Sequence, residues 1–202
     1  MQIEVQRKDD VTSFIDLAQS IRETSSPDYR KFDRHLRQLE HPANLNVALM
    51  GNLTVELIIP YLRVEAARIG KIAKFHASPF GQYMQDLHND ALTAFNPDAI
   101  LLILSPQAMR SDAFERFDQM TRADRLALRD GILAEIESWI ASATARTHAT
   151  LMIANFPCPA PAMGLADLTM DYGEQEFFLD LNLGLLRAVK NNPRVQLLDI
   201  AA

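Results

Sequence analysis

Polar side chains recur directly after the apolar runs of this chain, where a strand gives way to the next segment. Their hydroxyl and amide groups can hydrogen-bond the carbonyl or phosphate oxygens of a ligand. In an open α/β sheet, ligands bind in the crevice at the carboxyl ends of the strands. Each residue also has a purely structural interpretation, in which it caps a helix or holds a loop by hydrogen bonds. The strand-end set that we predict to bind a ligand comprises Gly51, Asn52, Thr54, Ser78, Gln82, Ser105 and Asn155.

The elements that must position this set alternate between strand and helix from residue 45 onward. Short, mostly apolar runs are typical of buried parallel strands. Helical patterns separate the runs, which indicates a parallel sheet with right-handed crossovers. We therefore expect an α/β domain of three layers, α/β/α, with a five-stranded parallel sheet. The predicted strands are Leu45–Met50, Ile72–His76, Ala99–Leu104, Thr150–Asn155 and Val195–Ile200.

Between these strands the sequence predicts helices of different lengths. One begins after Thr54 and ends at Gly70, a residue type that commonly follows a helix. Pro60 inside it lacks an N–H group and is expected to kink it. A short helix is predicted over Gln82–His88. A long helical stretch over Asp112–Thr144 is expected to divide near Thr121–Ala123, and the last helix spans Glu174–Val189.

The N-terminal segment has helical periodicity without a strand. Apolar residues from Val11 to Ile21 recur at helical spacing, with Asp10 as the expected N-cap. Ser25-Ser26-Pro27 breaks this helix, and a second one closes near His41-Pro42. We expect residues 1–43 to form a helical appendage and residues 44–202 to form the α/β domain. The appendage would pack on the domain or present a surface to a partner.

Composition excludes several classes of function. The formal net charge of −6 argues against nucleic acid as a partner. No apolar stretch approaches the length of a membrane span, and the N-terminus lacks the apolar core of a signal peptide, so a cytoplasmic location is expected. The single cysteine excludes an internal disulfide and a cysteine-based zinc cluster. The histidines show no metal-ligand spacing, and no cofactor or metal is expected.

The segment LNVALMGNLT, residues 45–54, is similar to the nucleophile block of SGNH/GDSL hydrolases. Leu53 and Thr54 match the GDSLT pattern, but Asn52 stands where the serine belongs, and an amide cannot serve as that nucleophile. The resemblance also implies an oxyanion block and a closing Asp-x-x-His. Ser105-Pro106-Gln107 stands where the oxyanion block is expected. Three residues after Asp199, where the motif requires a histidine, the chain has Ala202. We therefore expect no catalytic residue.

The order of several further segments resembles the SGNH-hydrolase-like N-terminal domain of FkbH-like proteins. Together with the strand–helix alternation, this implies the flavodoxin-like strand order 2-1-3-4-5. FkbH-like proteins carry a second domain of the haloacid-dehalogenase (HAD) phosphatase type, with an Asp-x-Asp motif, that loads a glyceryl unit onto an acyl carrier protein in polyketide biosynthesis. No Asp-x-Asp-x-Thr occurs here. The segments are GNLT (51–54), PYLR (60–63), HASPFGQY (76–83), NPDAILLIL (96–104), ANFPCPAP (154–161) and VQLLDI (195–200).

Three functions stay open at this point. The leading one is a non-hydrolytic module or truncated part of an FkbH-like protein, acting beside a C-terminal HAD-type domain. Its partner would be an acyl carrier protein or a small acyl or phosphorylated ligand. The second is an autonomous SGNH-like esterase or acyltransferase that uses Cys158 or Ser78 as nucleophile, although a partly buried thiol is the simpler interpretation of Cys158. The third is a structural or dimerisation domain.

Overall fold

The computed structural model of the chain describes residues 2–39, 42–160, 164–190 and 192–201. Five strands form one sheet in the order β2-β1-β3-β4-β5, with all neighbours parallel, as the sequence predicts. In the central register Ala48 lies beside His76 on one side and Ile100 on the other. The strands are β1 (Leu45–Gly51), β2 (Ala73–Ala77), β3 (Ala99–Ile103), β4 (Thr150–Ala154) and β5 (Val195–Leu198).

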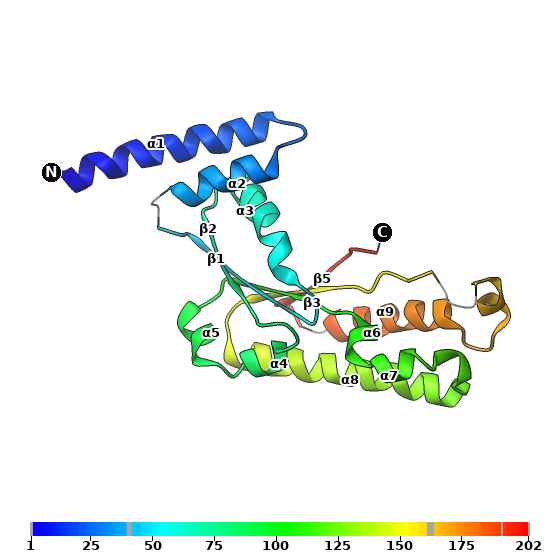
Figure 1. Cartoon of the computed structure of the whole chain (residues 1–202). Helices are drawn as coiled ribbons and strands as arrows, with labels where there is room; N and C mark the ends of the chain where they lie inside the picture. The colour runs from blue at the N-terminus through cyan, green and yellow to red at the C-terminus, as the bar shows by residue number, and fades with distance from the viewer. Residues whose placement is uncertain (1, 40–41, 161–163, 191, 202) are drawn as a thin grey trace.

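The two faces of the sheet carry different layers (Figure 1). Side chains alternate between the faces along each strand, so neighbours in the sequence face opposite layers. Leu49 and Leu101 pack with Val55 below α3 (Ile59–Arg68), whereas Met50 and Leu102 belong to the larger core on the other face. The helices around that larger core are α4 (Tyr83–Asp86), α5 (Asp90–Phe95), α6 (Pro106–Met109), α7 (Ser111–Phe114), α8 (Arg122–Arg146) and α9 (Glu174–Lys190).

The longest of these helices begins where the sequence predicts a break. Thr121 caps α8 in a capping box, in which its hydroxyl accepts from the Asp124 amide and the Asp124 carboxylate accepts from the Thr121 amide. The preceding stretch is not one long helix but α7 followed by the 3₁₀ turn η2 (Phe117–Gln119). In α8, the buried Ile132, Ile136 and Trp139 form the stripe that faces the core.

Two local predictions need correction. Pro60 does not kink a helix, because the segment after Thr54 is the 3₁₀ turn η1 (Val55–Ile58) and Pro60 lies in the first turn of α3, where no N–H bond is lost. Asp10 is not an N-cap, because α1 (Gln2–Glu23) begins earlier. His41 and Ala202 lie outside the described residues.

The N-terminal helices pack on α3. Asp28 caps α2 (Tyr29–Gln38), its carboxylate accepting from the Lys31 amide at 3.1 Å. Ile21 of α1 is fully buried against Val64 and Ala67 of α3. Figure 1 shows α1 and α2 standing above α3, away from the larger core. Among the helices whose residues are described, none is long and apolar enough to cross a membrane.

Candidate functional site

At the carboxyl edge of the sheet, Asn52 and Ser105 connect the ends of β1 and β3. The Asn52 side-chain amide donates to the Ser105 carbonyl at 2.9 Å, and its oxygen accepts from the Ser105 N–H at 2.8 Å. Asn52 is buried. The sequence predicts that both residues line a ligand crevice, whereas the structure joins them by two hydrogen bonds. This pairing engages the amide that we expected to meet a ligand.

Gly51 and Thr54 flank this connection with different roles. A Cβ at Gly51 would lie 2.1 Å from the carbonyl oxygen of Ile103, so β1 and β3 approach too closely there for any side chain. Thr54 is exposed, and although it precedes the turn η1, its side chain makes no capping hydrogen bond. Glycine is therefore a steric requirement at position 51, whereas Thr54 is exposed at the surface.

After β2, Ser78 belongs to a buried polar cluster that sequence analysis missed. The Ser78 hydroxyl donates to Oδ2 of Asp86, and Nε2 of His76 lies 2.8 Å from the same oxygen. Asp86 is buried in α4, and the His76 ring lies 5.5 Å from that of Phe95. Because Ser78 and His76 share one carboxylate oxygen, the imidazole is not placed between hydroxyl and acid, as a nucleophilic triad requires. The HASPF motif, followed by an acid within the predicted short helix, was the available signal.

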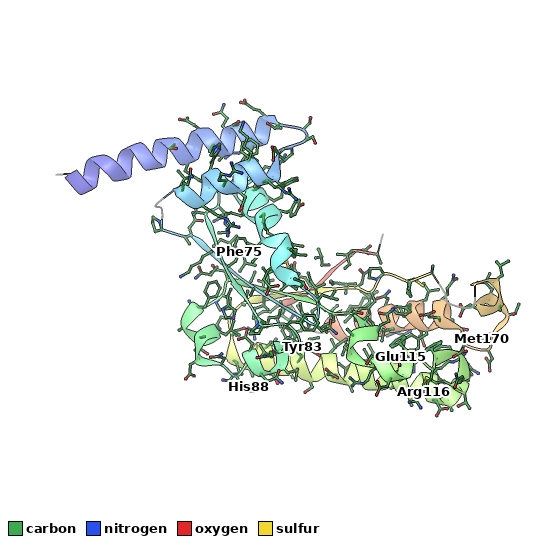
Figure 2. The ribbon with its side chains drawn as sticks, in the orientation of Figure 1. Phe75, Tyr83, His88, Glu115, Arg116 and Met170 are labelled. Carbon is green, nitrogen blue, oxygen red and sulfur yellow. The ribbon has the colours of Figure 1, made fainter. Side chains whose placement is uncertain are left out.

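In the same helix as Asp86, Tyr83 is linked to α8 and, through Glu135, to Arg110. Its hydroxyl donates to Glu135 of α8 at 2.5 Å, and Arg110 pairs with the same carboxylate at 2.7 Å. Burial, and then the hydrogen bond to Glu135, raise the pKa of Tyr83. Figure 2 shows Tyr83 between the sheet and α8. Gln82, just before Tyr83, is exposed and makes no side-chain capping bond.

The remaining two predicted residues stabilise loops. Ser105 caps α6, its hydroxyl accepting from the Ala108 amide at 3.3 Å and donating to Gln107 at 3.0 Å. The Asn155 oxygen accepts from the Ile200 amide at 2.7 Å, and its nitrogen donates to Asp199 at 2.7 Å. Asn155 thus fastens the segment after β5. Ligand binding by the strand-end set stays a prediction.

The chemistry available to Cys158 is restricted by its surroundings. The thiol is exposed and lies 3.6 Å from the Pro159 carbonyl. Burial, and then the negative charges of Glu174 and Asp167, raise the pKa of Cys158, which lowers its thiolate fraction at neutral pH. Among the described residues, no three His, Cys, Asp or Glu side chains are grouped to hold a metal ion. The edge of the sheet thus offers hydrogen-bonding groups rather than an activated nucleophile.

Comparison with known proteins supports the fold. No protein-family model and no curated protein sequence matches this chain. Among solved structures, it is similar to the N-terminal part of the protein BF1531 from Bacteroides fragilis, which contains a phosphatase domain and was determined in complex with Mg. The TM-score is 0.66 at 15% sequence identity, over 87% of this chain and 46% of that one. The chain therefore spans about half the length of that structure, with which it shares a fold.

Proposed function

We propose that this chain is a non-hydrolytic, SGNH-like module of an FkbH-like protein. It would bind a small acyl or phosphorylated ligand, or an acyl carrier protein, beside a C-terminal HAD-type domain that performs the transfer. The structural neighbour, a protein with a phosphatase domain of which this chain matches about half, supports a module of this kind. The motif order from Gly51 to Ile200 supports the FkbH-like assignment.

The observation that carries the proposal is the pairing of Asn52 with Ser105. Asn52 stands at the serine position of the hydrolase pattern, and its amide is hydrogen-bonded in both directions to the backbone of Ser105. The residue at the position of the nucleophile, Asn52, instead links the ends of β1 and β3 by hydrogen bonds. The edge keeps exposed polar groups, such as Thr54 and Gln82, that can contact a partner without attacking it.

An autonomous esterase is disfavoured by the surroundings of both candidate nucleophiles. Ser78 is buried and donates to Asp86 rather than to an imidazole. Cys158 has a raised pKa and two acidic neighbours. Among the described residues, neither group donates to an imidazole, the base of the triads that activate a serine or a thiol.

The test has two parts, one for chemistry and one for binding. The purified chain is incubated with p-nitrophenyl acetate and p-nitrophenyl butyrate beside the variants Ser78→Ala and Cys158→Ala. We expect no turnover above buffer for any of them; turnover that vanishes in one variant would establish the esterase instead.

For binding, calorimetry with a purified acyl carrier protein, in its apo and holo forms, is repeated with Thr54→Ala and Gln82→Ala. Saturable binding weakened by these substitutions supports the module, and binding unaffected by them places the partner elsewhere.

A further inference from the structure

A groove of about 520 Å³ lies on the opposite side of β2 from the Ser78 cluster. Its walls come from α1, α2, α3 and the chain entering β2, so it is separate from the strand-end set. The volume is within the range of small-molecule sites. The side chains that define this basic groove are apolar or cationic: Phe14, Leu36, Leu39, Ile72, Phe75, Arg37, Arg63 and Lys71.

The cations are held in place by their neighbours. Arg63 donates to the carboxylate of Asp33 and lies over the Phe75 ring, 5.2 Å from its centroid. Arg37 donates to the other oxygen of Asp33 at 2.8 Å. Asp33 itself is buried. A guanidinium fixed by a carboxylate and an aromatic face loses little freedom when it meets an anion.

Positive charge exceeds negative charge here, although the chain as a whole carries −6. Two arginines share the single carboxylate of Asp33, and Lys71 makes no ion pair with any described residue. Lys71 follows α3 and precedes β2, and both Lys71 and Phe75 line the groove. Among the described residues, the cations of the groove thus exceed their carboxylate partners by two charges, and Figure 2 shows Phe75 at this end of the sheet.

Lys74 also lines the groove, but its ammonium has a contact on the other face of the sheet. Its ammonium lies 5.9 Å from the ring centroid of Phe95, a residue of α5 that packs with the larger core on the other face. Lys71 and Lys74 therefore carry the same charge, but the Lys74 ammonium lies near Phe95 of α5.

We propose that the basic groove binds a phosphate monoester with a small apolar substituent. A phosphate dianion matches this excess of two positive charges, and it can accept paired hydrogen bonds from the planar guanidinium of Arg37 or Arg63. The apolar substituent would lie against Leu36, Leu39 and Phe75. This site is independent of the strand-end set and does not rest on the module proposed above.

The experiment titrates the full chain with phenyl phosphate and, separately, with benzoate, which has the same ring and a single charge. Calorimetry should show saturable binding of phenyl phosphate that is tighter than that of benzoate and weaker at high salt. Lys71→Gln and Arg37→Gln should each weaken it about tenfold, whereas the matched control Lys74→Gln should change it less than about twofold. Circular dichroism shows whether each variant is folded. If one of the two groove variants is unfolded, the other still tests the proposal.

Backbone NMR locates the ligand during the same titration. Shifts should gather at residues 36–39, 63 and 71–75. Absence of saturable binding, equal binding of benzoate, or an equal loss in Lys74→Gln would overturn the proposal. Shifts confined to residues 52, 78 and 105 would overturn it as well and would assign the phosphate to the carboxyl edge.

Discussion

Asn52 and Ser105 are joined by two hydrogen bonds of opposite direction, although they are separated by 53 positions in the sequence. Asn52→Ala removes both hydrogen bonds and leaves the half-buried N–H and carbonyl of Ser105 without their partner. We expect a loss of about 2 kcal/mol in the free energy of unfolding, measured by urea denaturation. Gln85→Ala, on an exposed face of α4, is the control and should have little effect. An unchanged Asn52→Ala stability would show that the connection contributes nothing.

Two glycines predict opposite effects of the same substitution. In Gly51→Ala the new Cβ would overlap the Ile103 carbonyl, which should cost about 3 kcal/mol or more, or prevent soluble expression. Gly131 lies within α8 with open space around its Cβ position, so Gly131→Ala should stabilise the protein by about 0.5–1 kcal/mol. Thermal unfolding of the two variants beside the wild-type protein measures both effects. A lower melting temperature for Gly131→Ala would contradict the open space around Gly131 in α8.

The carboxylate of Asp86 is the centre of the polar cluster after β2. Asp86→Ala leaves the Ser78 hydroxyl without its acceptor and His76 without its carboxylate partner. It should lower the free energy of unfolding by about 2–4 kcal/mol. Asp90→Ala, at an exposed acid in the first turn of α5, is the matched control and should cost less than about 1 kcal/mol. Equal losses for the two variants in chemical denaturation would refute a special role of Asp86.

Tyr172 predicts a loss of stability in alkali. Burial, followed by its hydrogen bond to Asp180, raises the pKa of Tyr172 to about 12. The folded state holds this proton more tightly than the unfolded chain, whose tyrosines titrate near pH 10. The resulting stability is complete below about pH 10 and is lost as the pH rises toward 12. Tyr172→Phe should lose less stability over that interval, and one late tyrosinate transition should disappear from its absorbance titration.

Cys158 predicts slow alkylation. Its raised pKa reduces the thiolate fraction at neutral pH, so iodoacetamide should react more slowly than with a cysteine in an unstructured peptide, and the rate should keep increasing above pH 9. Mass spectrometry reports this thiol alone, because the chain has one cysteine. Glu174→Gln, which removes a neighbouring negative charge, should accelerate the reaction at neutral pH. A wild-type rate above that of the peptide would contradict the raised pKa.

The sheet could be predicted because its signals are local. Each strand is an apolar run within a residue or two of its predicted bounds, as with Ala99–Ile103, and the helices between them favour parallel pairing. The break before α8 was also predictable, since Thr121 and Asp124 form a capping box over four residues.

What could not be predicted depends on side chains that meet only after folding. Asp33 finds Arg63 thirty positions away, and Asn52 faces the backbone of Ser105 rather than a crevice. An asparagine at a strand end has the same local sequence pattern whether its amide binds a ligand or a neighbouring loop. Which of the two it binds depends on the distance between the strand ends in the folded protein. The basic groove likewise combines residues of α1, α2, α3 and the chain entering β2, which no sequence spacing links.

The position of α1 and α2 on α3 has a consequence for dynamics. These helices share with α3 a small apolar cluster around Ile21 and Val64, separate from the larger core on the other face of the sheet. Such a cluster can open as a cooperative unit at a lower free energy than global unfolding. Amide hydrogens of α2 should therefore exchange with solvent sooner than those of β3. An anion held between Arg37 of α2 and Lys71 before β2 would tie this unit to the sheet and slow that exchange.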